Sequence, residues 1–160
     1  MILGTAISAL VVSMGIVSPA NAATDKIVVI QEAPVIKQNE KVVEIGQTGS
    51  ILYFEGLLRT TTEKRIGLLT GQTTVIHLSP ESGETTVRYR ELVFALPGGQ
   101  IVALGTSIYA ARTTTNFTDD NAPVRIAVVG GTGKYRSAQG EVITTKRADG
   151  SYRHVIVLDK

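Results

Sequence analysis

Hydrophobic and polar residues alternate along most of the chain from Lys26 onward, and no stretch repeats its apolar positions with a helical period. Alternation places successive side chains on opposite faces, as in a β-strand. Short β-branched and aromatic runs separated by turn residues are typical of all-β proteins. The predicted strands are Lys26–Gln31, Lys41–Gly46, Ser50–Arg59, Ile66–Leu78, Thr85–Leu96, Gln100–Ala111, Pro123–Val129, Gly140–Arg147 and Ser151–Leu158.

Turn residues between these strands predict consecutive antiparallel hairpins. The strongest signal is Asp149-Gly150, because that pair readily adopts the positive φ angles of a tight hairpin turn. Hairpins of long strands close most naturally into an up-and-down barrel, which leaves no exposed sheet edge. A two-sheet sandwich is the alternative. The polar segment 112–123 is predicted to be a mobile loop at one end of the barrel.

The N-terminal segment has the layout of a secretory signal peptide. Residues 2–18 are apolar and uncharged, and Pro19 and the triplet Ala20-Asn21-Ala22 follow. Small residues at these positions favour cleavage after Ala22, although no Lys or Arg precedes the apolar run. We therefore predict a signal peptide at residues 1–22 and a secreted or periplasmic domain at 23–160. A retained membrane anchor is the alternative.

Composition narrows the function classes. The 160 residues are 43% hydrophobic and 19% charged, which suits one domain with a sizeable core. The net charge of +2 is dispersed, so nucleic acid is not an expected partner. The absence of cysteine excludes disulfides, thiolate metal sites and a cysteine nucleophile. The two histidines, His77 and His154, lack carboxylates at ligand spacing, so we predict no metal site and expect both at the surface or the barrel mouth.

The glycine-rich segment 129–142 resembles a phosphate-binding loop at first sight. A P-loop would need glycine at Val128 and a serine or threonine at Tyr135. A dinucleotide-binding fingerprint would need glycine at Arg136, followed by a helix rather than the strand predicted here. The segment is therefore predicted to be a turn between two strands, with no bound nucleotide. Its residues Lys134, Tyr135 and Arg136 are expected at the solvated rim.

Four segments in this order resemble the allene oxide cyclase and dirigent superfamily, and its bacterial barrel members in particular. The resemblance implies an eight-stranded antiparallel up-and-down β-barrel whose apolar cavity opens at one end. It also implies a cofactor-independent cyclase or isomerase that binds a small hydrophobic molecule, and assembly as a homo-oligomer, either a trimer or a dimer. The segments are "GSILYFEGLL" (49–58), "IGLLTGQTTVI" (66–76), "LPGGQIVALG" (96–105) and "IAVVGGTGKYRSAQGEV" (126–142).

This chain departs from the plant members at three cavity positions. Plant cyclases have Phe-Thr-Asn where this chain has Phe54-Glu55-Gly56, so the asparagine that helps to bind a water has no equivalent. Their cavity cysteine falls on Thr73, and the cavity arginine of many dirigent proteins falls on Gln139. The chemistry of the plant members therefore does not transfer directly.

The candidate catalytic residues are Arg90 and Glu91, of which strand alternation allows only one to point inward. An inward Arg90 would bind a carboxylate or stabilise an enolate, whereas an inward Glu91 would act as a general base with a raised pKa. Either residue could instead lie on the outer wall or in a subunit contact. The candidate substrate-binding residues are Phe54, Thr73, Tyr109 and Gln139.

The favoured function is a cyclase or isomerase that needs no cofactor and directs the stereoselective cyclisation of a small, largely apolar intermediate. One alternative is a dirigent-like binder that orients an intermediate made by another protein. The other is a non-catalytic exported carrier. An open lumen with a few converging polar groups would favour the enzyme, whereas a lumen filled by side chains would favour the carrier.

Overall fold

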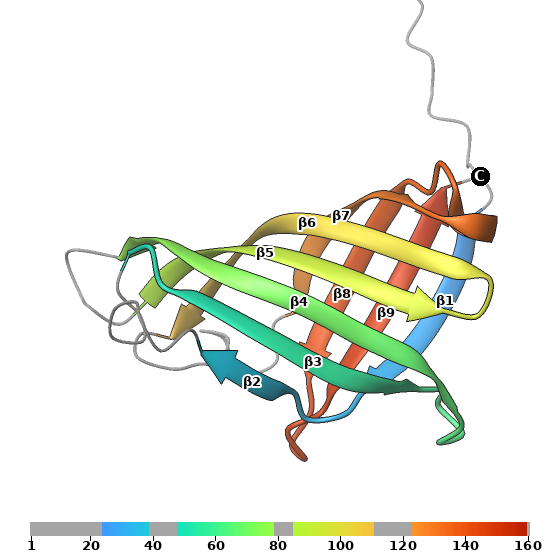
Figure 1. The fold of residues 1–160 in the computed structure, drawn as a ribbon, viewed down its shortest axis with the longest axis horizontal. Coiled ribbons are helices and arrows are strands. Elements are labelled where there is room, and N and C mark those ends of the chain that lie inside the picture. Colours follow the sequence, from blue (N-terminus) through green and yellow to red (C-terminus); the bar gives the residue numbers. More distant parts are fainter. Residues whose placement is uncertain (1–23, 39–47, 79–84, 111–122, 160) are drawn as a thin grey trace, which may run out of the picture.

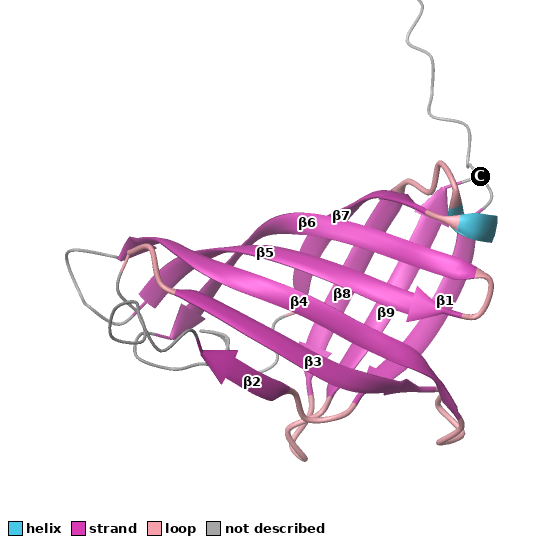
Figure 2. Ribbon diagram, viewed as in Figure 1, coloured by secondary structure: helices cyan, strands magenta, loops and turns pink. Residues whose placement is uncertain are grey.

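The structure, a computed structural model, describes residues 24–38, 48–78, 85–110 and 123–159 (Figures 1 and 2). The predicted signal peptide, the predicted strand at 41–46 and nearly all of the predicted loop at 112–123 lie outside these residues. The elements are β1 (Thr24–Gln31), β2 (Val35–Gln38), β3 (Ile51–Arg59), β4 (Arg65–Leu78), β5 (Thr85–Leu96), β6 (Gly99–Ala110), β7 (Val124–Gly131), the 3₁₀ turn η1 (Gly133–Tyr135), β8 (Gly140–Lys146) and β9 (Tyr152–Asp159).

The strands form a closed antiparallel barrel, which confirms the predicted fold (Figure 1). The sheet runs in the order β1-β9-β8-β7-β6-β5-β4-β3-β2, and pairing of β1 with β3 closes it into eight strands. The ninth strand, β2, continues along the edge of β3 after β1 ends. Gln31 lies opposite Leu58, and Val35 lies opposite Glu55. The pair β1 and β2 thus acts as one barrel strand that is broken around Pro34.

The alternation pattern located most of the strands. Both ends of β5 were predicted, and the ends of the other predicted strands within the described residues agree to within two residues. The exception is β2, which was not predicted. Pro34 lies directly before β2; proline lacks the N–H that a strand interior needs, but a strand can begin directly after it.

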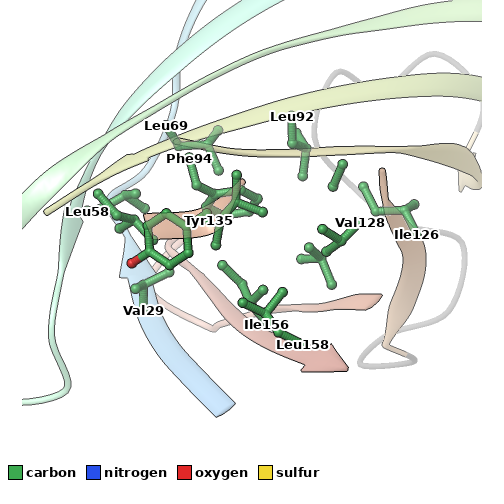
Figure 3. Close-up of a cluster of buried hydrophobic side chains, with 14 residues drawn as sticks. Val29, Leu58, Leu69, Leu92, Phe94, Ile126, Val128, Tyr135, Ile156 and Leu158 are labelled. Carbon is green, nitrogen blue, oxygen red and sulfur yellow. The ribbon is translucent and has the colours of Figure 1, made fainter. Parts of the chain in front are cut away.

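One half of the barrel interior is filled by apolar side chains from all around the wall (Figure 3). Leu92 and Phe94 of β5 are fully buried there. Tyr135, which projects from η1 into the same cluster, is only 7% exposed. The prediction of a solvated rim position is therefore wrong for Tyr135, while Lys134 and Arg136 are exposed as predicted.

The glycines of the 129–142 segment serve the turn. Gly133 has φ +60°, and a Cβ there would lie 2.1 Å from the carbonyl oxygen of Gly98. A Cβ at Gly131 would lie 2.3 Å from the carbonyl oxygen of Gln100. Both positions therefore have no room for a side chain. The N–H of Lys134 donates to the Gly98 carbonyl at 2.9 Å, which holds η1 against the β5–β6 turn and directs the neighbouring Tyr135 into the barrel.

Candidate functional site

The interior face of β5 changes from polar to apolar along its length. Arg88 and Arg90 lie near the start of the strand and are 0% and 4% exposed, whereas Leu92 and Phe94 follow them on the same face. Buried polar residues on the other strands extend the polar half of the interior around the barrel. The buried polar residues of this half are Gln31, Thr73, Thr86, Arg88, Arg90, Ser107, Thr144 and His154.

Strand pairing places Arg90 among interior residues on both sides. It lies opposite Thr73 of β4 and opposite Gly105 of β6. Thr73 is 5% exposed, and at position 105 a Cβ would lie 2.7 Å from Cγ2 of Ile126. Of the two candidate catalytic residues, Arg90 is therefore the one that points inward.

Glu91 lies on the outer wall, one residue further along β5. Its carboxylate accepts a hydrogen bond from Nε2 of Gln72 at 3.2 Å. Both side chains line a shallow outer groove together with Tyr53, which is 43% exposed. Because Glu91 points outward, it does not act as a general base inside the barrel.

Two of the predicted substrate-binding residues lie inside the barrel. Thr73 is buried beside Arg90, and Phe54 packs against the apolar cluster. The lack of a side chain at Gly71 makes room for Phe54, since a Cβ there would lie 2.7 Å from Cζ of the ring. The backbone of Tyr109 pairs with Thr86 of β5, but the side chain of Tyr109 lies outside the described part of the structure.

Gln139, a predicted substrate-binding residue, does not line the interior. It is exposed and borders an outer groove of about 680 Å³ with Val129 and Asp159. The reason is the strand register: Gly140 pairs with the buried Leu158, so Gly140 lies on the inner face and the residue before it on the outer face.

His154 is buried inside the barrel, so the prediction of a surface position is wrong for this histidine. It is 1% exposed, and the Phe94 ring meets it edge-on with centroids 5.2 Å apart. Its Nδ1 lies 2.9 Å from Oγ1 of Thr144, and its Nε2 lies 3.0 Å from Oε1 of Gln31. The side chain of His77 lies outside the described residues.

Burial and charge keep His154 neutral. Loss of hydration, together with the smaller effect of the positive charge of Arg90, lowers the pKa of His154 from 6.5 to about 3. Because the amide oxygen of Gln31 can only accept, Nε2 of His154 carries the proton. Nδ1 of the neutral ring is then an acceptor, to which the Thr144 hydroxyl donates.

Five residues of this polar half were not singled out from the sequence: Gln31, Thr86, Arg88, Ser107 and Thr144. Arg88 is fully buried, and its Nε donates to Oγ1 of Thr86 at 3.1 Å. Nε2 of Gln31 and Oγ of Ser107 are buried atoms that make no hydrogen bond within the described part of the chain. Arg88 shares a face with Arg90, and Ser107 shares a face with Tyr109, so strand alternation alone could have included both.

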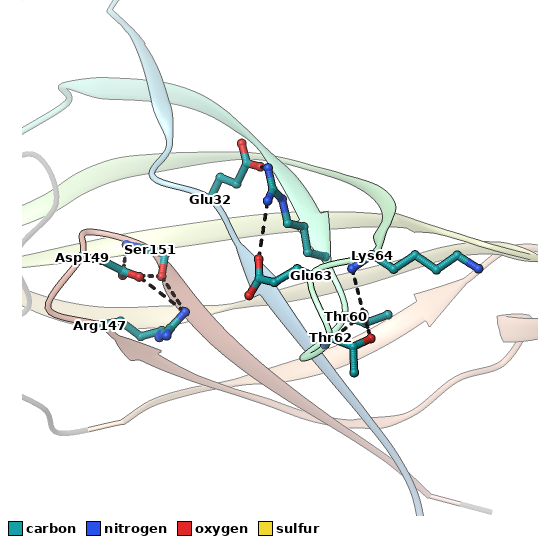
Figure 4. A network of polar contacts seen from close by, with 9 residues as sticks. Glu32, Thr60, Thr62, Glu63, Lys64, Arg147, Asp149 and Ser151 are labelled. Atoms are coloured by element: carbon teal, nitrogen blue, oxygen red, sulfur yellow. Dashed lines mark hydrogen bonds and ion pairs between the residues drawn. The ribbon is translucent and has the colours of Figure 1, made fainter.

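A further groove, of about 460 Å³, lies on the outside of the barrel between two turns (Figure 4). Arg59 forms ion pairs with Glu32 and Glu63 on one side of it. On the other side, hydrogen bonds from Ser151 lower the pKa of Asp149. None of the predicted site residues lines this groove.

The described residues contain no group of three or more His, Cys, Asp or Glu side chains arranged to hold a metal ion. Among the same residues, there is no helix that is both long and apolar enough to cross a membrane.

Comparison with models of known protein families and with curated proteins finds no match to this chain. Solved structures share its fold. A pyocyanin demethylase is 20% identical with a TM-score of 0.65, covering 84% of this chain and 99% of its own. AbnU, an exo-specific intermolecular Diels-Alderase, is 21% identical with a TM-score of 0.64, covering 86% and 99%. The Diels-Alderase AbmU from Streptomyces koyangensis is 14% identical with a TM-score of 0.63, covering 89% and 71%.

Proposed function

We propose that this protein is a cyclase that binds a small, largely apolar molecule inside the barrel and directs its ring closure. The observation that carries the proposal is the buried guanidinium of Arg90, which lies inside the barrel beside Thr73 and next to an apolar half of the interior. Such a combination suits a ligand with an apolar body and an electron-rich oxygen. The Diels-Alderases that share the fold support the same reaction class.

The ligand space that we propose is restricted to the polar half, since the apolar cluster and Tyr135 fill the other half. Ser107 of β6 lies opposite Arg88 of β5, and Arg90 follows on the same face of β5. A ligand beside Ser107 in this half would therefore meet both arginines.

Ring closure by cycloaddition is the reaction that these groups could promote without further reagents. A diene and an alkene bearing a carbonyl exchange three carbon–carbon π bonds for two carbon–carbon σ bonds and one new π bond, and no proton, electron pair or leaving group departs. Donation from Arg90 to the carbonyl oxygen withdraws electron density from the alkene and stabilises the charge that develops on this oxygen. The surrounding wall would hold the chain in a folded conformation near the reactive geometry, which lowers the entropic part of the barrier.

A test uses two readouts on the same protein. Binding is measured by calorimetry with naphthoate, which joins an apolar body to an anionic oxygen. Catalysis is measured with a synthetic triene carrying an unsaturated ketone, whose products are resolved by chiral chromatography. We expect naphthoate to bind and one diastereomer to be enriched over the uncatalysed ratio, and both effects to be lost in Arg90→Met.

The matched control is Arg153→Met, because Arg153 is an exposed residue of the outer wall and its loss should change neither readout. A protein that binds naphthoate yet leaves the product ratio at the uncatalysed value would be a carrier or a dirigent-like binder. Binding and catalysis that survive unchanged in Arg90→Met would contradict the proposed role of the interior arginine.

We also propose membership of the allene oxide cyclase and dirigent superfamily, export after cleavage at Ala22, and a homo-oligomer. The first strand begins at Thr24, so cleavage after Ala22 would leave every described strand in the mature protein.

Exposed apolar residues on the outer wall support subunit contacts. Ile76 and Ile108, for example, are 47% and 52% exposed. N-terminal sequencing of the exported protein and light scattering of the purified domain test the second and third points.

A further inference from the structure

Gln31 is a buried amide whose two polar atoms differ in their contacts. The side chain is 2% exposed and lies on the inner face of β1, between the pairing partners Tyr152 of β9 and Leu58 of β3. Its Oε1 accepts the hydrogen bond from His154, while its Nε2 is buried and makes no hydrogen bond within the described residues. An unsatisfied buried donor lowers stability, so a role for it is expected.

His154 lies against the oxygen of the Gln31 amide. Its imidazole is held by Thr144, by the edge-on contact with Phe94, and by stacking on Tyr152 at 6.4 Å between centroids. Nε2 of the neutral ring donates to the oxygen of the amide at 3.0 Å. The NH₂ group of Gln31 is thereby left as a donor.

Gly56 provides the space in which this NH₂ group lies. A Cβ at position 56 would be 2.7 Å from Nε2 and 2.8 Å from Cγ of Gln31, closer than any side chain allows. Gln31 and Arg90 lie on different, non-adjacent strands. Gln31 is on β1, which pairs with β3, and Arg90 is on β5, which pairs with β4. The two side chains therefore approach the interior from separate parts of the wall.

We infer that Gln31 is a second ligand-binding residue, whose Nε2–H donates to an acceptor oxygen on the ligand, and that His154 is the residue that positions it. This inference rests on the proposed function of the barrel interior. It narrows the substrate class to apolar molecules with two separate oxygen acceptors: one is bound by Arg90, and the other, a neutral carbonyl, is bound by Gln31.

The test compares two probes of nearly equal shape, a naphthoate carrying an acetyl group and one carrying an isopropenyl group at the same carbon. Only the acetyl group has an acceptor oxygen. Wild-type protein should prefer the acetyl probe by roughly threefold to tenfold, the effect of one neutral hydrogen bond. Gln31→Met should bring the two affinities within about twofold while keeping the isopropenyl affinity. A merely structural loss would weaken both probes equally.

Gly56→Ala is the second variant, because its added Cβ displaces the Gln31 amide without removing it. It should also abolish the preference for the acetyl probe, and it replaces Gln31→Met if that variant does not fold. His154→Phe should also abolish the preference, since the amide is no longer held. Gln72→Met on the outer wall is the control and should retain the preference. Equal affinities in wild type, or a preference that survives in both Gln31→Met and Gly56→Ala, would overturn this inference alone. Failure of wild type to bind either probe would overturn it together with the proposed function.

Discussion

Arg90 and Glu91 are neighbours in β5 whose side chains lie on opposite faces of the barrel wall. Arg90 is buried beside Thr73, while Glu91 accepts a hydrogen bond from Gln72 on the outside. The wall of a barrel separates water from an interior of low dielectric constant, in which a charge acts more strongly. A ligand in the interior therefore meets the cation of this pair and not the carboxylate.

The first prediction concerns this pair. Arg90→Met should weaken naphthoate binding by at least tenfold, because a charge-assisted hydrogen bond is worth about 1.5–3 kcal/mol. Glu91→Gln should leave the affinity within about twofold. Calorimetric titration of the two variants checks both values. Equal losses in the two variants would contradict the assignment of Arg90 to the interior and Glu91 to the outer wall as the cause of binding.

The second prediction concerns the pH dependence of stability. The pKa of His154 is about 3 in the folded protein and about 6.5 when unfolded, so protons favour the unfolded state. The contribution of this residue is fully present above pH 6.5 and is lost progressively as the pH falls toward 3. By pH 5 the free energy of unfolding should drop by up to about 2 kcal/mol.

Urea denaturation at several pH values measures this loss, with His154→Gln as the comparison. The variant should show a flatter profile between pH 6.5 and 5, since its amide does not titrate. The lowered pKa of Asp149 changes stability only below about pH 4, so it does not interfere in this range. A wild-type profile that is already flat would contradict the burial of a neutral His154.

The third prediction concerns the turn at η1, where Gly133 and Ser137 both have positive φ angles, +60° and +68°. Gly133→Ser should lower the free energy of unfolding by more than about 2 kcal/mol, because its Cβ has no room beside Gly98. Ser137→Gly should raise it by about 0.5–1 kcal/mol, since an exposed left-handed serine is strained. Denaturant unfolding of this reciprocal pair measures both, and the same sign for the two changes would refute the argument.

The fourth prediction concerns Tyr135, which packs in the apolar cluster that fills one half of the barrel. Tyr135→Ala should lower the free energy of unfolding by about 3 kcal/mol, because the tyrosine ring is packed in the apolar cluster. Arg136→Ala, one residue further along and exposed, should change it by less than about 0.5 kcal/mol. Thermal and denaturant unfolding of the two variants distinguish the residues. Equal stabilities of Tyr135→Ala and Arg136→Ala would contradict the burial of Tyr135 and would indicate the solvated rim position that the sequence predicted.

The sequence predicts most of the wall because alternation is a local property. The ends of β5 and the shared face of Arg88, Arg90, Leu92 and Phe94 follow from it directly. Alternation gives two faces but does not say which one is inside. That choice for β5 depends on pairing with Thr73 and Gly105, residues distant in sequence.

The predictions that were wrong involve contacts that no local pattern contains. Tyr135 follows three glycines within six residues, which reads as a solvated turn, yet the turn folds back on the barrel end and buries the ring. His154 was assessed as a metal ligand rather than by its place on β9, where Tyr152 and Ile156 share its buried face. Gln139 was assigned from a resemblance, and the register of Gly140 places it outside.

A crystal structure of the protein with bound naphthoate would show directly whether a ligand lies inside the barrel beside Arg90. We expect electron density inside the barrel, with the carboxylate within hydrogen-bonding distance of the Arg90 guanidinium and the rings directed toward Leu92 and Phe94. Density confined to the outer wall, for example in the groove beside Gln72 and Glu91, would contradict this expectation.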